Sequence, residues 1–156
     1  MEKKYELTNE FIKLRKRNKT KLYRIKALRD FGDVKAGDIG GFVESEHNLS
    51  HDGDCWIYND AKVYDGAHVS SNAKIMNKAE VYEFANVYDD AVVRDAAVVC
   101  GTSRAFGQAK IYDNALLYDN SYVGGTAEVF ADAVLTDTDI TYGLIASREI
   151  FRRRYK

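Results

Sequence analysis

The sequence predicts an all-β protein: a parallel β-helix of about five triangular coils over residues 51–140, with a small N-terminal β cap and a short C-terminal helical segment. Three observations favour this fold. An aliphatic residue recurs every six positions, a small residue follows almost every one of them four positions later, and the 156 residues include no proline. A fixed short period without insertions is typical of a solenoid, whose repeats stack on one another.

The six-residue register holds for fourteen consecutive units. The aliphatic positions are Ile57, Val63, Val69, Ile75, Val81, Val87, Val93, Val99, Ala105, Ile111, Leu117, Val123, Val129 and Leu135. The small positions are Ala61, Ala67, Ala73, Ala79, Ala85, Ala91, Ala97, Ser103, Ala109, Ala115, Ser121, Ala127 and Ala133, and Asp139 breaks this second series.

Each unit reads small–x–aliphatic–x–turn–turn, as in Ala61 to Gly66. Side chains alternate along a strand, so we expect Ala61 and Val63 to point inward and Lys62 and Tyr64 to point outward. Asn, Asp and Gly are frequent at the two turn positions, where the backbone needs angles that other residues rarely adopt. Three such edges make one coil of about 18 residues, and like residues of successive coils stack at the strand spacing.

This pattern resembles the hexapeptide-repeat superfamily, whose repeat is aliphatic–x–x–x–small–x. Within it, the chain is similar to the YdcK-type proteins of bacteria and prophages. That similarity rests on the leader LYRIKALRDFGDVKAGDIGGFVESEHNLS at residues 22–50 and on the units AKVYDG, AEVYEF, ANVYDD and AKIYDN. The resemblance implies a left-handed β-helix, against the usual right-handed crossover. It also implies a fold that is often trimeric in its enzymes, many of which are acyltransferases, but no particular activity for the YdcK-type proteins.

The two ends, residues 1–50 and 141–156, lie outside the repeat within what we expect to be one structural domain. In the first, KLYRIKAL alternates like a strand and Arg17-Asn18-Lys19 offers a turn after FIKLR. This predicts a β-hairpin that caps the open edge of the first coil and leads into it. In the second, an amphipathic helix covering the last coil is predicted by the spacing of Leu144, Ile145, Ile150 and Phe151.

The register assigns each outward residue to one of three flat faces, called here the first, second and third. An apolar row on the first face is predicted to be an interface, made of Val98, Leu116 and Val134 with their neighbours Tyr82, Cys100 and Tyr118. A folded protein seldom exposes so contiguous an apolar patch. We therefore expect either a homo-oligomer, dimer or trimer, sealed by this face, or coverage by the C-terminal segment. Secondary interface candidates are Phe106 and Tyr122 on the second face and Tyr112 and Phe130 on the third.

His68 on the second face is the candidate catalytic residue. The resemblance implies this role, because hexapeptide-repeat acyltransferases use a histidine as general base toward an acceptor hydroxyl or amine. The chain lacks the loop insertions that usually build a substrate groove, so a solvent-facing or cap-contacting histidine is the alternative. His47 and His51 have an i, i+4 spacing that suits a metal on a helix. We place them at the cap junction instead, and expect no metal and no cofactor.

Charge is segregated along the chain. Residues 1–36 carry 12 Lys/Arg and 5 Asp/Glu, residues 37–147 carry 6 and 18, and residues 148–156 carry 5 and 1. The basic ends include Lys13, Arg15, Lys16, Arg17, Lys19, Lys21, Arg152, Arg153 and Arg154. An acidic middle disfavours nucleic acid along the β-helix and leaves open an acidic decoy that mimics nucleic acid toward a basic protein.

The two cysteines are expected in different coils, with Cys55 inside and Cys100 outside, so we expect no disulfide between them. The start MEKKYELTNEF lacks an apolar signal segment, and no apolar run approaches the roughly 20 residues of a membrane span. These features predict a cytoplasmic protein with free thiols and no membrane partner.

Three functions stay open on these residues. The first is a non-catalytic β-helix, of phage or prophage origin by its resemblance, that works by self-association and by binding another protein. The second is an acetyl-coenzyme A-dependent acyltransferase with His68 as general base. The third is an acidic inhibitor that occupies the nucleic-acid site of a basic protein.

Overall fold

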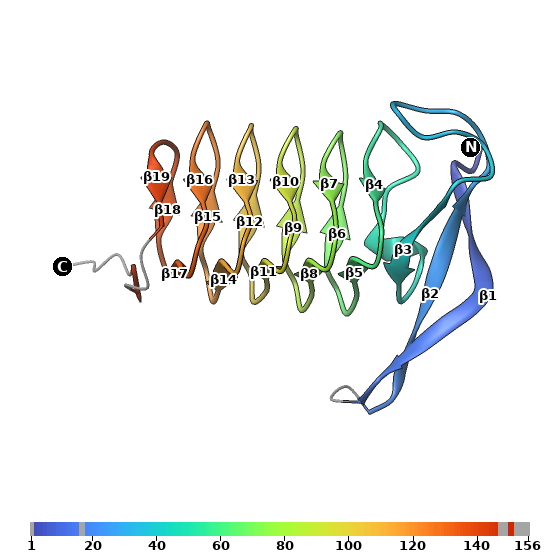
Figure 1. Ribbon diagram of the computed structural model, residues 1–156, viewed down its shortest axis with the longest axis horizontal. Helices are drawn as coiled ribbons and strands as arrows, with labels where there is room; N and C mark the ends of the chain where they lie inside the picture. Colours follow the sequence, from blue (N-terminus) through green and yellow to red (C-terminus); the bar gives the residue numbers. More distant parts are fainter. Residues whose placement is uncertain (1, 16–17, 147–149, 152–156) are drawn as a thin grey trace.

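The structure, a computed structural model, describes residues 2–15, 18–146 and 150–151. It is a left-handed parallel β-helix with three flat sides and an N-terminal cap, which confirms the predicted fold class (Figure 1). Short strands of successive coils pair in parallel along each side, so that Val98 lies beside Leu116 and Val99 beside Leu117.

Three stacks of strands form the sides. The first face carries β5 (Lys62–Val63), β8 (Glu80–Val81), β11 (Val98–Val99), β14 (Leu116–Tyr118), β17 (Val134–Thr136) and β20 (Ile150–Phe151). The second face carries β6 (His68–Val69), β9 (Asn86–Val87), β12 (Arg104–Ala105), β15 (Tyr122–Val123) and β18 (Asp139–Ile140). The third carries β4 (Trp56–Ile57), β7 (Lys74–Ile75), β10 (Val92–Val93), β13 (Lys110–Ile111), β16 (Glu128–Val129) and β19 (Leu144–Ile145).

The core is a column of the small and aliphatic side chains of the repeat. Ala91 and Val93 are typical, because each has no exposed surface. Outward residues hold the coils together through their backbone, as where the Lys74 N–H donates to the Ala91 carbonyl at 3.0 Å. Both inward series of the sequence are confirmed through the middle coils.

The corners have a second bonding pattern that joins one coil to the next. The first turn residue of most units has a positive φ, 59° at Asp95, 56° at Asp113 and 54° at Ala131. In this conformation a short side chain reaches the next coil: the Asp95 carboxylate accepts from the Asp113 N–H at 3.1 Å, and the Asp113 carboxylate accepts from the Ala131 N–H at 3.0 Å. The predicted role of Asn, Asp and Gly at the corners is therefore confirmed. Some of the acidic side chains form hydrogen bonds that join one coil to the next.

The solenoid is one coil longer than predicted, since the third face has six strands in the described part of the chain. The break at Asp139 marks a shortened corner. Tyr122 pairs with Asp139 rather than with the residue 18 positions ahead, and Thr138 takes the buried small position. The unbroken six-residue register would place Ile140 outside, but the shortened corner aligns it with inward Val123, and it packs against the core.

The predicted C-terminal helix is wrong for the described residues. Leu144 and Ile145 form β19, which pairs with β16, and Ile150–Phe151 form β20, which pairs with β17. The backbone of the preceding coil offers a row of unpaired donors and acceptors, and the chain satisfies them by continuing the ladder. Ile145 packs against the core, whereas Leu144 is 69% exposed.

The N-terminal cap contains the predicted hairpin. Strands β1 (Tyr5–Leu14) and β2 (Thr20–Ala27) form an antiparallel ribbon, called here the arm, that projects beside the first coils (Figure 1). Asn18 and Lys19 turn its tip with φ of 52° and 59°. Strand β3 (Ile39–Val43) pairs with β2 and then with β5, so the arm extends the sheet of the first face, and the 3-10 helix η2 (Glu46–Asn48) follows.

A buried lysine fastens the start of the chain to the first coil. The Lys4 ammonium donates to the carbonyl oxygens of Cys55 at 2.7 Å and Gly53 at 3.2 Å, and lies 4.6 Å from the Phe31 ring centroid. Burial lowers the pKa of Lys4 and raises that of the Cys55 thiol. Cys55 is inside, as expected, and both cysteines have free thiols.

Candidate functional site

The first face is divided into a covered half and a free half. Leu22 of the arm is fully buried against the outward side chains of Phe42 and Tyr64, and Ile12 packs at the margin of this cluster. The Tyr64 and Tyr82 rings stack at 5.0 Å between centroids and 5° between planes. The arm therefore covers the outer surface of the first coils, which the sequence analysis missed although the alternation of apolar residues in the arm could have indicated it.

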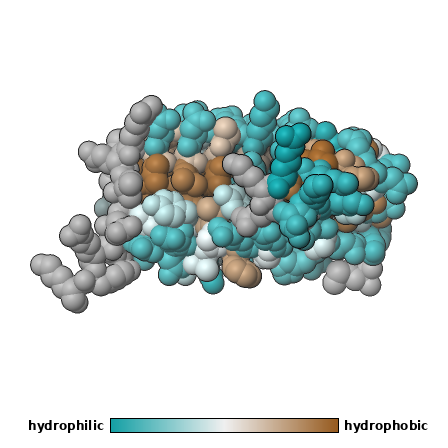
Figure 2. Space-filling view, turned by 90° about the horizontal axis from the view of Figure 1, so that it is seen from below, coloured by the Kyte–Doolittle hydropathy of each residue, from teal (hydrophilic) through white to brown (hydrophobic). Residues whose placement is uncertain are grey.

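The free half begins where the arm ends. Val98, Leu116 and Val134 lie side by side in β11, β14 and β17 and are half-buried. Figure 2 shows an apolar area in the C-terminal half of this side, beside hydrophilic residues. It forms an open groove of about 500 Å³, lined by Tyr82, Glu83, Cys100, Gly101, Leu116, Tyr118, Asp119 and Val134. The structure thus brings together all six residues of the predicted interface.

The rims of this groove carry acidic groups. Glu83 and Asp119 lie along one edge, and Asp132 lies along the other with Asn114, around a second hollow of about 370 Å³. An apolar strip between carboxylates has the layout of an interface core with a polar rim. The rim predicts a partner with positive charge at its margins.

Cys100 points outward as the register requires, but its expected exposure is wrong. Only 6% of the residue is exposed, because it lies in the ladder between Tyr82 and Tyr118, and its thiol donates to the Leu117 carbonyl at 3.6 Å. Burial raises the pKa of this thiol, which disfavours the reactive thiolate. Burial also raises the pKa of Tyr82 to about 12.

His68 is half-buried on the second face, where the cap reaches it. Its Nδ1 is hydrogen-bonded to the backbone carbonyl of His47, and the two imidazole rings lie 5.3 Å apart. Because a carbonyl only accepts, Nδ1 must carry a proton, and the neutral tautomer that fits this bond has its lone pair on Nε2. His68 therefore contacts the cap, and in the neutral ring this hydrogen bond leaves the lone pair on Nε2, which is the form that a general base requires.

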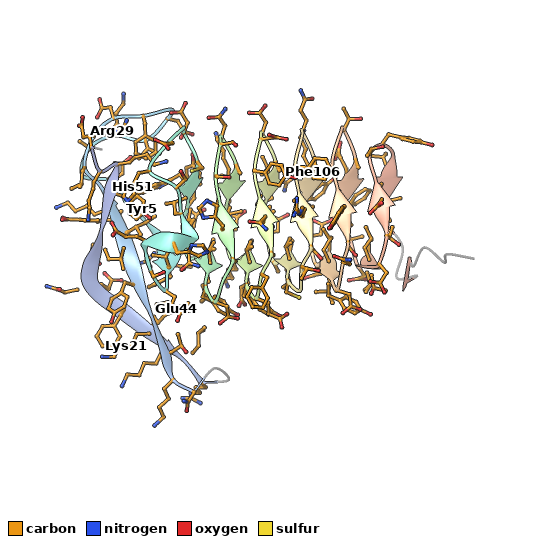
Figure 3. All side chains as sticks on the ribbon, turned by 180° about the vertical axis from the view of Figure 1, so that it is seen from behind. Tyr5, Lys21, Arg29, Glu44, His51 and Phe106 are labelled. Carbon is orange, nitrogen blue, oxygen red and sulfur yellow. The ribbon has the colours of Figure 1, made fainter. Side chains whose placement is uncertain are left out.

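The other two histidines belong to the cap. The His51 ring stacks on Tyr5 at 4.2 Å, its Nδ1 accepts from the Lys4 N–H, and its Nε2 lies 3.2 Å from the Glu46 carboxylate (Figure 3). His47 lies in η2. Within the described residues, no three side chains of the metal-binding types come together.

The secondary interface candidates stack on neighbours within the chain. On the second face Phe106 stacks on Tyr88 at 5.6 Å and lies across Gly124, where a Cβ atom would come within 2.2 Å of the ring. On the third face Tyr112 stacks on Phe130 at 5.1 Å. Tyr122 lies under the Arg104 guanidinium at 5.5 Å. Each of these aromatic rings is therefore partly covered by a side chain of the neighbouring coil.

Those of the predicted basic residues that the structure describes lie on the arm. Lys13, Arg15, Lys19 and Lys21 are exposed around its tip, and Lys21 is labelled there in Figure 3. The other predicted basic positions, Lys16, Arg17, Arg152, Arg153 and Arg154, lie outside the described residues.

Comparison with known proteins gives a partial match. The chain is 44% identical over 55 residues to a protein of Escherichia coli strain K12 named uncharacterized acetyltransferase YdcK. The aligned segment makes up 35% of this chain and spans 17% of the length of that relative. A scan against models of protein families finds no match. No helix in the described ranges is long and apolar enough to cross a membrane.

The repeat, the coil and the partial match agree. Small and aliphatic residues alternate inside six-residue edges, three edges close each coil, and the corners use left-handed backbone angles. The fold and this partial match fit the hexapeptide-repeat β-helix superfamily.

Proposed function

We propose that this protein is a non-catalytic β-helix that works by binding protein, first of all a second copy of itself, through the free half of the first face. The observation that supports this most is the half-buried apolar row of Val98, Leu116 and Val134, which borders an open groove among the described residues. Outward strand positions in a solvated sheet are usually polar. An apolar row at three successive coils gains free energy only when it is covered, at about 25 cal/mol for each Å² of apolar surface removed from water.

Light scattering of the wild type and a Leu116→Lys variant tests this proposal. Leu116 points away from the core, so the substituted coil should fold, while an unpaired charge in a dry contact would cost several kcal/mol. The expected result is a folded variant with one half or one third of the wild-type mass. A matched Lys110→Glu variant on the third face should keep the wild-type mass. A wild type that is monomeric at all accessible concentrations would contradict the proposal.

A second candidate, an acyltransferase, is supported by two observations. His68 presents Nε2 as a free base, since its Nδ1 is committed to the His47 carbonyl. The similar segment belongs to a protein whose name calls it an acetyltransferase. Under this alternative Nε2 would accept the proton of an acceptor hydroxyl or amine while the oxygen or nitrogen of that acceptor attacks the thioester carbonyl. The acyl–sulfur bond would then break, and coenzyme A would leave as the thiol with the proton returned from Nε2.

Acetyl-coenzyme A separates the two candidates. Under the binding proposal, the melting temperature should not change when acetyl-coenzyme A is added. The acyltransferase is favoured instead if acetyl-coenzyme A binds saturably and acyl transfer is lost in His68→Ala but retained in His47→Ala. The second variant is the matched control because it removes the neighbouring ring and leaves the carbonyl that orients His68.

A further inference from the structure

The arm has two sides of different chemistry. Ile12 lies opposite Leu22 across its two strands, and both side chains pack against the covered half of the first face. Side chains alternate along a strand, so the residues on either side of this pair point away from the β-helix. That side of the arm, called here the outer patch, is formed by two cross-strand pairs, Phe11 with Tyr23 and Lys13 with Lys21.

The aromatic pair of the outer patch is accessible. Phe11 is 43% exposed and Tyr23 is half-buried, and their ring centroids lie 5.9 Å apart with 54° between the planes. The Lys21 ammonium lies 4.7 Å from the Phe11 centroid, so a cation directly borders the rings. Rings in this setting offer a face on which a nucleic-acid base can stack while neighbouring cations contact its phosphates.

Lys13 and Lys21 have no anionic partner among the residues that the structure describes. Residues 11–21 include six Lys/Arg and no Asp/Glu. Nearer the root of the arm, Arg24 is paired with Glu10 at 3.0 Å, but no ion pair reaches the two lysines. Like charges placed directly opposite in a sheet are destabilising. A polyanion bound to the outer patch would remove this repulsion.

The rest of the molecule restricts where a polyanion can lie and of what kind it is. Residues 37–147 have 18 Asp/Glu against 6 Lys/Arg, so the β-helix repels a polyanion and leaves it to the arm. A lipid surface would favour apolar side chains at the projecting tip, but the tip turns through Asn18 and Lys19 (Figure 1). Paired bases in a duplex hide their faces, so exposed rings favour single strands.

We infer that the outer patch binds single-stranded nucleic acid, with a base stacked on Phe11 and Tyr23 and the adjoining phosphates held by Lys13 and Lys21. The two pairs are two residues apart along each strand, roughly 7 Å, which a lysine side chain spans. Neither contact depends on the order of the bases, so the binding tolerates different sequences. This activity goes beyond the proposed self-association, because the free half of the first face takes no part in it.

Fluorescence anisotropy with labelled oligothymidylate and oligouridylate of about 16 nucleotides tests this inference and distinguishes DNA from RNA. Saturable binding of either probe at low salt supports it, and binding of neither overturns it. Lys13→Gln with Lys21→Gln removes two phosphate contacts, so the slope of log affinity against log salt should become shallower by about 1.4. Lys78→Gln with Lys110→Gln, at exposed positions of the β-helix, changes the net charge equally and should leave the slope unchanged.

Substitutions of one ring separate stacking from charge. Phe11→Leu keeps an apolar side chain in β1 but removes the ring, so the affinity should fall by about fivefold or more while the salt slope stays the same. Phe11→Trp retains a ring and should bind like the wild type. Phe84→Leu, at an exposed phenylalanine of the β-helix, is the matched control and should change nothing. Normal binding by Phe11→Leu would overturn the stacking and with it the inference.

Two competing ligands are tested with the same proteins. A duplex of the same length that binds as tightly as the single strand would overturn the inference, since its bases offer no free faces. Binding to phosphatidylserine vesicles that is lost in the double lysine variant, when neither oligonucleotide binds, would assign the arm to a lipid surface instead. Failure of the proposed function is distinguishable, because Leu116→Lys should bind the probes whether or not it dimerises. A monomeric wild type that binds them would contradict self-association and leave this inference intact.

Discussion

At the scale of single residues, the corners determine how well one coil stacks on the next. A left-handed backbone angle costs a residue with a Cβ atom roughly 1–2 kcal/mol unless a short polar side chain bonds locally. Asp95 and Asp113 satisfy this condition, because each carboxylate accepts the N–H of the next corner. Ala131 has the same angle, φ 54°, and no side-chain acceptor to offer.

The Ala131→Asn substitution should therefore stabilise the protein. Asparagine adopts the left-handed angle more readily than alanine, so the free energy of unfolding should rise by about 1 kcal/mol. Chemical denaturation measures this change. Ala96→Asn, at an exposed corner position that does not have a positive φ, is the matched control and should change stability by no more than about 0.5 kcal/mol. An equal effect of both substitutions would contradict the corner account.

The free energy of unfolding should depend on pH through Tyr82, which lies at the boundary between the arm and the free half. Burial raises its pKa to about 12, against an ordinary value of 10.0. Between these two values the unfolded chain releases this proton and the folded chain keeps it, so the free energy of unfolding falls as pH rises. Tyr82→Phe should make this fall shallower than in the wild type. Denaturation curves with the same slope against pH in both proteins would show that Tyr82 is not covered.

At the scale of elements, the inward positions fix the register of the whole stack. Ala91 has no exposed surface and begins the edge that forms β10. Ala91→Leu inserts three carbons where the corner leaves no room, and overpacking of this kind costs about 1–3 kcal/mol. Thermal and chemical unfolding should both show the loss. Asp90→Leu, at the exposed corner residue next to it, should be close to wild type, and a normal melting temperature for Ala91→Leu would disprove the register.

The element boundaries show where sequence reasoning succeeds and where it fails. Periodicity located the inward residues and the three faces, because each residue type repeats in the same physical environment fourteen times. It failed at Asp139, since a corner shortened by one residue shifts every later position, and Leu144 and Ile145 then fit a helical spacing by coincidence. It also missed that the arm packs on the first face. The alternation of apolar residues in the arm indicates that one side of it is buried, but not that Leu22 would pack against Tyr64.

At the scale of the whole molecule, the proposed function depends on a surface that neither the repeat nor the cap requires. The predicted interface residues on the first face do lie together, and the arm adds a covered half that defines where the free half begins. The buried state of Cys100 follows from the same ladder and was not predictable from its outward register. The candidate base His68 was located by resemblance, whereas its bond to the His47 carbonyl needed the fold of the cap.

Carbodiimide cross-linking of a mixture of light and heavy-isotope-labelled protein tests the central claim most directly. The reagent joins a lysine amine to a carboxylate in contact with it, and a link between light and heavy peptides must join two chains. We predict mixed-isotope links that join a lysine of one chain to Glu83, Asp119 or Asp132 on the rims of the free half of the other, and their loss in Leu116→Lys. Mixed links that start only from Lys110 on the third face, or an absence of mixed links from a protein that is dimeric by mass, would contradict association through the first face.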